Sequence, residues 1–250
     1  MSQLLHDRTQ SRNLETIYLA LAWCLPTVYT WLYFVSWAGT SAGQWAYSVG
    51  KIVQFALPAL WWLVIARYLP NSAESSEPHW RIWFNRRDLT WGVTVGAAIA
   101  IAIFLLYTLW LQHSPVLDQL RPTVHQKLSQ FSINSPAAFL ILALFYSLFH
   151  SLMEDYYWRA FVYGPLRHLI GVLPSAIVSS IGFMAHHVIV VGVYFAPHWE
   201  QVAFFSLSVA VGGVIWAWLY QRSNSLLCIW VSHGLVDAAL MTIGYLLAFA

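Results

Sequence analysis

Runs of about twenty apolar residues recur along this chain, and they constrain its fold more than any other feature. A run of that length can cross the hydrocarbon core of a bilayer as one helix. Hydrophobic residues make up 59% of the 250-residue chain and charged residues only 9%, whereas soluble domains carry about a quarter charged residues. The sequence therefore predicts an all-α fold, a polytopic bundle of membrane helices.

The pattern predicts about seven transmembrane helices within a single transmembrane domain that covers residues 1–250. Residues 38–50 and 70–90 are expected to be loops. The polar stretch 112–135 contains an amphipathic segment that should lie along the membrane surface or re-enter it as an additional helix. In the third helix, Gly92 and Gly96 are spaced for close packing against a neighbour. The expected helix ranges are 17–37, 51–69, 91–111, 136–169, 174–195, 202–220 and 226–249.

The basic residues indicate how the chain is oriented. With a cytosolic N-terminus and seven spans, nine of the twelve Lys and Arg residues fall on the cytosolic side and three on the other. Because basic residues are enriched on the cytosolic side, we expect the N-terminus inside and the C-terminus outside. Short loops and the absence of a eukaryotic targeting segment favour a bacterial inner membrane, and a removable signal peptide is not expected.

Charge and cysteine content exclude other classes of protein. A net charge of +2 gives no case for nucleic acid as a partner. Cys24 and Cys228 are the only cysteines, and both lie in apolar runs. A disulfide or a cysteine-based metal site is therefore not expected.

Two adjacent carboxylates, Glu154 and Asp155, interrupt the long apolar run that begins at Pro136. Carboxylates at membrane depth usually face a bundle interior or a water-filled cavity. Asp155 and Arg159 are four residues apart and can pair on one helix face. Glu154 points about 100° away from Asp155 and has His150 as its nearest polar neighbour on that face. Glu154 is thus available for chemistry, although an ion pair that holds two helices together would explain the same pattern.

Histidines and a third carboxylate recur in the apolar runs that follow, and spacing places them at one depth. Glu154 and His187 are symmetric about the turn at Ile170-Gly171, so antiparallel helices would bring them to the same level. His233 lies about 15 Å along its helix from the same cytosolic face. Asp237 shares a face with His233, which suits an orienting carboxylate, two ligands of one metal, or a local helix contact.

Three motifs therefore follow one another along the chain. They are Glu154-Asp155-x-x-x-Arg159, Phe183-x-x-x-His187 and His233-x-x-x-Asp237, whereas His186, next to His187, is expected to pack rather than to act. This series resembles the CPBP family, also called Abi, of CAAX-protease-like intramembrane endopeptidases. The family patterns are Glu-Glu-x-x-x-Arg, Phe-x-x-x-His and His-x-x-x-Asn or Asp, so Asp155 and Asp237 stand at the positions that vary.

The resemblance implies a glutamic or metallo-endopeptidase that acts near the cytosolic face, with residues 136–249 as its catalytic helical core. Glu154 would be the general base, and His187 would help it to activate a water molecule. His233, with Asp237 behind it, would stabilise the oxyanion. Asp155, Arg159 and Phe183 would support these residues. A divalent metal such as zinc, held by His187, His233 and Asp237, is compatible with the resemblance but not required by it.

The expected partners are membrane lipids and a membrane-associated peptide or lipidated protein. Eukaryotic members of the family cleave prenylated proteins, and bacterial members are linked to bacteriocin immunity or peptide processing. Two other classes stay open. One is a proton-coupled transporter that uses the same residues as a relay, although no inverted repeat supports it. The other is a scaffold or bacteriocin-immunity protein without catalytic activity.

Overall fold

The computed structural model describes residues 2–65 and 85–250, and the described chain is helical, without a β-strand. Six helical stretches within this part are long and apolar enough to cross a membrane. The prediction of an all-α polytopic bundle is therefore confirmed. The predicted helix 51–69 and loop 70–90 extend into residues outside the described part, and the count of seven spans stays a prediction.

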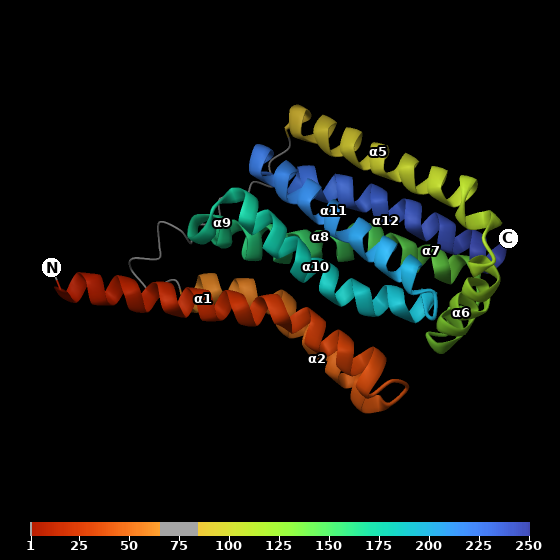
Figure 1. The fold of residues 1–250 in the computed structure, drawn as a ribbon, viewed down its shortest axis with the longest axis horizontal. Coiled ribbons are helices and arrows are strands. Elements are labelled where there is room, and N and C mark those ends of the chain that lie inside the picture. The colour runs from red at the N-terminus through yellow and green to blue at the C-terminus, as the bar shows by residue number, and fades with distance from the viewer. Residues whose placement is uncertain (1, 66–84) are drawn as a thin grey trace. The chain divides into compact units, whose positions relative to one another are not determined.

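The observed helices follow the predicted ranges with a few differences. They are α1 (Ser2–Trp31), α2 (Ser41–Leu60), α5 (Arg86–Leu109), α6 (Val116–Gln130), α7 (Pro136–Leu144), α8 (Ser151–Asp155), α9 (Gly164–Ile170), α10 (Val172–Phe195), α11 (Trp199–Ser223) and α12 (Leu226–Phe249) (Figure 1). Short π-helical segments follow α1, α2, α7 and α8, namely Leu32–Ser36, Trp61–Ile65, Phe145–His150 and Tyr156–Tyr163.

Both predicted loops are partly wrong, because the described end of the loop 70–90 is helical from Arg86 onward, where α5 begins. The range 38–50 was expected to be a loop because it is rich in small and polar residues, but α2 begins within it, at Ser41. The hydroxyl of Thr40 caps this helix by accepting a hydrogen bond from the backbone N–H of Gly43. A good cap satisfies one of the free N–H groups of a first turn, and it outweighs the modest helix propensity of the residues that follow.

Local sequence signals define the helices that carry the motifs. The Ser135 side chain accepts a hydrogen bond from the N–H of Ala138, with Pro136 in the first turn of α7. Ser225 caps α12 in the same way. The turn between α9 and α10 uses Gly171 with φ of +90°, a conformation that side chains disfavour. The predicted ends of the last four long helices are thus close to those observed.

Contacts divide the chain into two compact units, which we describe separately. Unit 1 comprises Met1–His79, Tyr156–Val190 and Ser206–Ala217. In unit 1, α1 lies along α2, and the hydroxyl of Tyr18 donates a hydrogen bond of 2.8 Å to the carbonyl of Leu57 (Figure 1). α1 also contacts α10, because the indole N–H of Trp23 donates to the carbonyl of Val178 over 2.8 Å.

Unit 2 comprises Trp80–Asp155, Val191–Phe205 and Trp218–Ala250, and the packing of α5 on α12 dominates it (Figure 1). A Cβ atom at Gly92 would lie 2.4 Å from the carbonyl oxygen of Cys228, and one at Gly96 would lie 2.8 Å from the Cα of Ser232. The close packing predicted for these two glycines is therefore confirmed.

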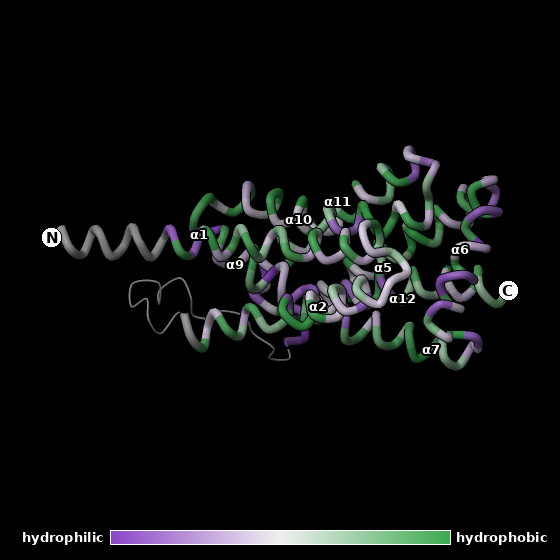
Figure 2. Tube along the Cα trace, turned by 90° about the horizontal axis from the view of Figure 1, so that it is seen from below, coloured by the Kyte–Doolittle hydropathy of each residue, from purple (hydrophilic) through white to green (hydrophobic). Residues whose placement is uncertain are grey.

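The predicted amphipathic segment is also helical, as α6 of unit 2. Hydrophilic residues recur along its trace, whereas the trace of α7 is largely hydrophobic (Figure 2). Leu120 of α6 joins a buried cluster with Tyr107, Leu111, Ile243 and Leu247. α6 is therefore anchored to α12 through its apolar face.

Candidate active site

Glu154 and Asp155 lie at the end of α8, a short α-helical segment between two π-helical ones. Both carboxylates are buried, with 4% and 0% of their surface exposed. They lie inside a continuous helical span, Pro136–Ile170, that is long and apolar enough to cross the membrane. Carboxylates in such a position are costly and mark functional sites, and π-helical turns are frequent at such sites.

In unit 2, Glu154 contacts two imidazole groups. One of its carboxylate oxygens, Oε1, lies 3.2 Å from Nε2 of His150. The other, Oε2, lies 4.0 Å from Nε2 of His233, which comes from α12. The i,i+4 spacing predicted the contact with His150, but it did not place His150 among the site residues. The structure adds His150 to the cluster.

His233 has carboxylates near both ring nitrogens. Nδ1 lies 3.3 Å from Oδ2 of Asp155, and Nε2 lies 3.8 Å from Oδ1 of Asp237. An ionised carboxylate only accepts hydrogen bonds, so Asp155 favours a proton on Nδ1 and orients the ring. Asp155, rather than Asp237, is thus the closer carboxylate to His233. Asp237 and Glu154 both lie near Nε2 of the ring.

A small residue allows α12 to approach this segment. The backbone oxygen of Ser147 would lie 2.6 Å from a Cβ atom at Gly234. One turn further on, the hydroxyl of Ser151 donates to the same oxygen over 2.7 Å. The close contact at Gly234 holds the neighbouring His233 at the level of Glu154 and Asp155.

In unit 1, α10 presents Phe183, His186 and His187. Nδ1 of His187 lies 2.8 Å from the carbonyl oxygen of Phe183. Because a carbonyl only accepts, Nδ1 carries the proton and Nε2 has the lone pair that a base or a metal ligand needs. His186 is buried and stacks on Trp158, with ring centroids 5.9 Å apart and the planes inclined by 3°. This contact is of the packing type expected for His186.

Arg159 also belongs to unit 1 and is 1% exposed. Its guanidinium carbon lies 4.7 Å from the ring centre of Phe183 and 5.5 Å from that of Trp216. Arg159 therefore packs against the phenylalanine of the second motif. Its pairing with Asp155 stays a prediction from their spacing.

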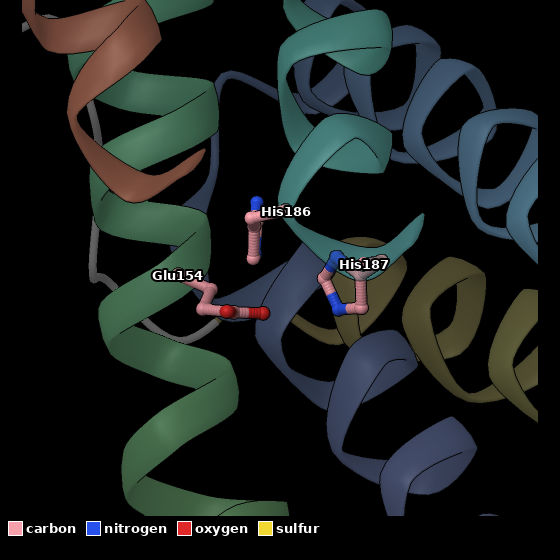
Figure 3. Close-up of side chains that lie close together, drawn as sticks. All are labelled: Glu154, His186 and His187. Carbon is pink, nitrogen blue, oxygen red and sulfur yellow. The ribbon is translucent and has the colours of Figure 1, made fainter. Parts of the chain in front are cut away.

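The predicted site residues thus form two groups. Unit 2 brings together Glu154, Asp155, His233 and Asp237, and unit 1 brings together Arg159, Phe183 and His187. Figure 3 draws Glu154 of α8 with His186 and His187 of α10. That His187 joins the cluster of unit 2 stays a prediction from the spacing about the turn at Gly171.

The chemistry of these side chains fits a zinc ion. Ligand atoms that share a tetrahedral zinc at about 2.1 Å lie about 3.4 Å apart. The distances from His233 Nε2 to Asp237 and Glu154, 3.8 Å and 4.0 Å, need only small side-chain movements to reach that value. The predicted ligands His187, His233 and Asp237 belong to the residue types that zinc binds.

An apolar cavity of about 670 Å³ lies beside the cluster in unit 2. Ser147 and Leu148 line it on one side, and Gly234 and Ala238, the neighbours of His233 and Asp237, line it on the other. The remaining lining residues, from α7 and α12, are almost all hydrophobic. A cavity of this size and character is suited to a hydrocarbon chain.

The fold and the cluster define a class: a multi-pass helical membrane protein with buried carboxylates and imidazoles in its spans. Comparison with known families is more specific. Residues 136–239 match the model of the family described as Rce1-like, type II CAAX prenyl endopeptidase. No curated protein and no solved structure matches the chain.

The matched region begins at the first residue of α7 and ends in α12, so it contains all three motifs. This match confirms the resemblance found in the motifs. The family is one of proteases, which agrees with the prediction of an enzyme.

Asp155 and Asp237 should differ in their effects on activity. Asp155→Asn replaces the carboxylate near Nδ1 of His233 with a group that can also donate, and we expect about a 10-fold to 100-fold lower turnover, as for other residues that orient a histidine. Asp237→Asn should cost much less, since family members have Asn there. Turnover per folded molecule measures both. A larger loss in Asp237→Asn than in Asp155→Asn would make Asp237 the orienting carboxylate.

Proposed function

We propose that this protein is an intramembrane endopeptidase that cleaves a membrane-associated, lipid-modified protein or peptide near the cytosolic face of a bacterial inner membrane. One observation carries the proposal: a buried carboxylate, Glu154, lies beside two imidazoles within a CAAX protease domain. A buried carboxylate without a catalytic or structural need would be selected against in a membrane helix.

Glu154 acts as the general base in this proposal. It takes a proton from a water molecule as that water attacks the scissile carbonyl, and it returns a proton to the leaving amine. His187, with a lone pair on Nε2, positions the same water. His233, protonated on both ring nitrogens, donates a hydrogen bond from Nε2 to the developing oxyanion, and Asp155 faces its Nδ1–H and holds the ring in orientation. A zinc ion bound by His187, His233 and Asp237 would take the place of the His233 hydrogen bond and would itself supply electrostatic stabilisation of that oxyanion.

The cavity beside the cluster supports a lipid-modified substrate. Its lining is apolar, and it lies next to the residues that flank His233 and Asp237. A lipid chain in this cavity would bury apolar surface and hold the attached peptide beside Glu154, and such positioning contributes strongly to catalysis.

A cleavage assay with the full-length protein in lipid vesicles tests the proposal. We expect a peptide that ends in a prenylated CAAX sequence to lose its last three residues, with mass spectrometry to identify the product. The same peptide without the prenyl group should be cleaved more slowly by about 10-fold or more, since the binding energy of the chain is lost.

Two outcomes would overturn parts of this proposal. Equal cleavage of both peptides would remove the lipid chain from substrate recognition. Proton flux across the vesicle membrane without any peptide product would instead indicate a transporter, in which the same carboxylates and histidines relay protons.

A further inference from the structure

Trp216 lies outside all three motifs, yet it contacts residues of two of them. It belongs to α11 in unit 1 and is buried, with 4% of its surface exposed. One turn earlier, Gly213 allows α11 to approach α10 closely, because a Cβ atom there would lie 2.8 Å from the hydroxyl of Ser180. The large indole of Trp216 thereby reaches the ring of Phe183, at a centroid distance of 6.1 Å and in edge-to-face geometry.

The guanidinium of Arg159 lies over both rings. It is 4.7 Å from the centre of Phe183 and 5.5 Å from that of Trp216. A cation near aromatic faces is stabilised most where water is excluded, and Arg159 is almost wholly buried. Trp216, Arg159 and Phe183 therefore form one packed group, in which each side chain restricts the other two.

Phe183 transmits this restriction to His187. Its carbonyl oxygen lies 2.8 Å from Nδ1 of His187, and the two rings have a centroid distance of 4.6 Å. The position and tautomer of the His187 ring thus depend on the position of Phe183. A side chain that holds Phe183 in place also holds Nε2 of His187 in its working orientation.

From these contacts we infer that Trp216 is a positioning residue for His187, acting through Arg159 and Phe183. The inference deepens the proposed function and rests on it, since it concerns the histidine that positions the attacking water. Trp216 does not touch the reacting atoms. It fixes the geometry of α10 from a neighbouring helix, where none of the family motifs lies.

The test compares Trp216→Leu with Trp216→Phe. Leucine keeps an apolar side chain but removes the aromatic face that Arg159 contacts, whereas phenylalanine retains a face. We expect Trp216→Leu to lower kcat about tenfold with KM within about twofold, because a misplaced group affects the chemical step. Trp216→Phe should keep kcat within about threefold of the wild-type value. Trp218→Leu, on the same helix, is the matched control, since Trp218 is 46% exposed and contacts Trp91 instead.

A second readout does not depend on activity. In protein labelled with ¹⁵N-histidine, with the signals of His187 assigned from His187→Gln, the Nδ1–H tautomer should dominate in the wild type and in Trp216→Phe. In Trp216→Leu the signals should shift or broaden through exchange with the other tautomer. If these changes occur while no variant, including the wild type, cleaves peptide, the proposed function fails and the positioning role of Trp216 stands.

Two results would overturn the inference. One is a Trp216→Leu protein whose His187 signals and kcat per folded molecule equal those of the wild type. The other is a loss that Trp218→Leu reproduces in full, because that loss would reflect general packing of α11.

Discussion

Glu154→Gln should leave the protein folded and lower peptide hydrolysis by about 100-fold or more. Glutamine keeps the size and shape of the side chain, and its amide oxygen can still accept from Nε2 of His150, which lies 3.2 Å from the carboxylate. It has no basic oxygen to take the proton from water. Hydrolysis in lipid vesicles gives the activity, and thermal unfolding in detergent should show a midpoint at or above that of the wild type.

Companion variants separate a shared-water mechanism from independent effects. Glu154→Asp should lose most of the activity, since the base withdraws by one methylene and errors near 1 Å can cost about 100-fold. His187→Ala should resemble Glu154→Gln, and the double variant should be little worse than either, because residues that act on one water are not additive. If the losses of the two single variants multiply in the double variant, the two residues do not act on one water. Cleavage by Glu154→Gln at the wild-type rate would contradict the assignment of Glu154 as the base.

Gly234→Val should have the largest effect on the structure of the site. A Cβ atom at this position would lie 2.6 Å from the backbone oxygen of Ser147, and a backbone atom cannot rotate away. Steric crowding of this kind typically costs about 1–3 kcal/mol in the free energy of unfolding. The same displacement would move His233 away from Asp155, now 3.3 Å from its Nδ1, so turnover should fall by about 100-fold.

The matched control for this prediction is Gly192→Ala in α10. No atom lies within 4 Å of a Cβ built at Gly192, so alanine meets open space there. Replacing a glycine inside a helix by alanine should then stabilise the protein slightly, by about 0.5–1 kcal/mol. Thermal unfolding and turnover measure both variants. A Gly234→Val protein as stable and active as the wild type would show that α12 is not held in place by this contact.

Much of the architecture follows from the sequence because the bilayer restricts the choices. Apolar runs of sufficient length, capped by Ser135 and Ser225, give helices whose ends agree closely with prediction. Three helices begin earlier than predicted: α1 at Ser2, α5 at Arg86, and α2 in a segment whose composition suggested a loop but whose Thr40 caps a helix. Composition describes a whole window, whereas a cap acts at one residue.

The site was less predictable than the fold. The i,i+4 rule brought out the contacts of Glu154 with His150 and of His233 with Asp237, since both pairs are local. The contact of His233 with Asp155 joins two helices far apart in the sequence, and helical periodicity carries no information on it. Trp216 was missed for the same reason, because a buried tryptophan in an apolar run looks like any other lipid-facing or core residue.

Because the segment Phe145–His150 is π-helical, the direction in which Glu154 points depends on the helix type of this segment. A π turn accommodates one residue more than an α turn, so everything beyond it is rotated relative to a regular continuation of α7. Phe145 and Phe149 of this segment are exposed, and lipid acyl chains would cover their side chains in a membrane. Glu154 is buried. Straightening this segment into a regular α-helix of the same length would rotate Glu154 by about 100° and turn the carboxylate out of its cluster. Deleting one residue would remove the extra residue of the π turn and leave the carboxylate facing the cluster.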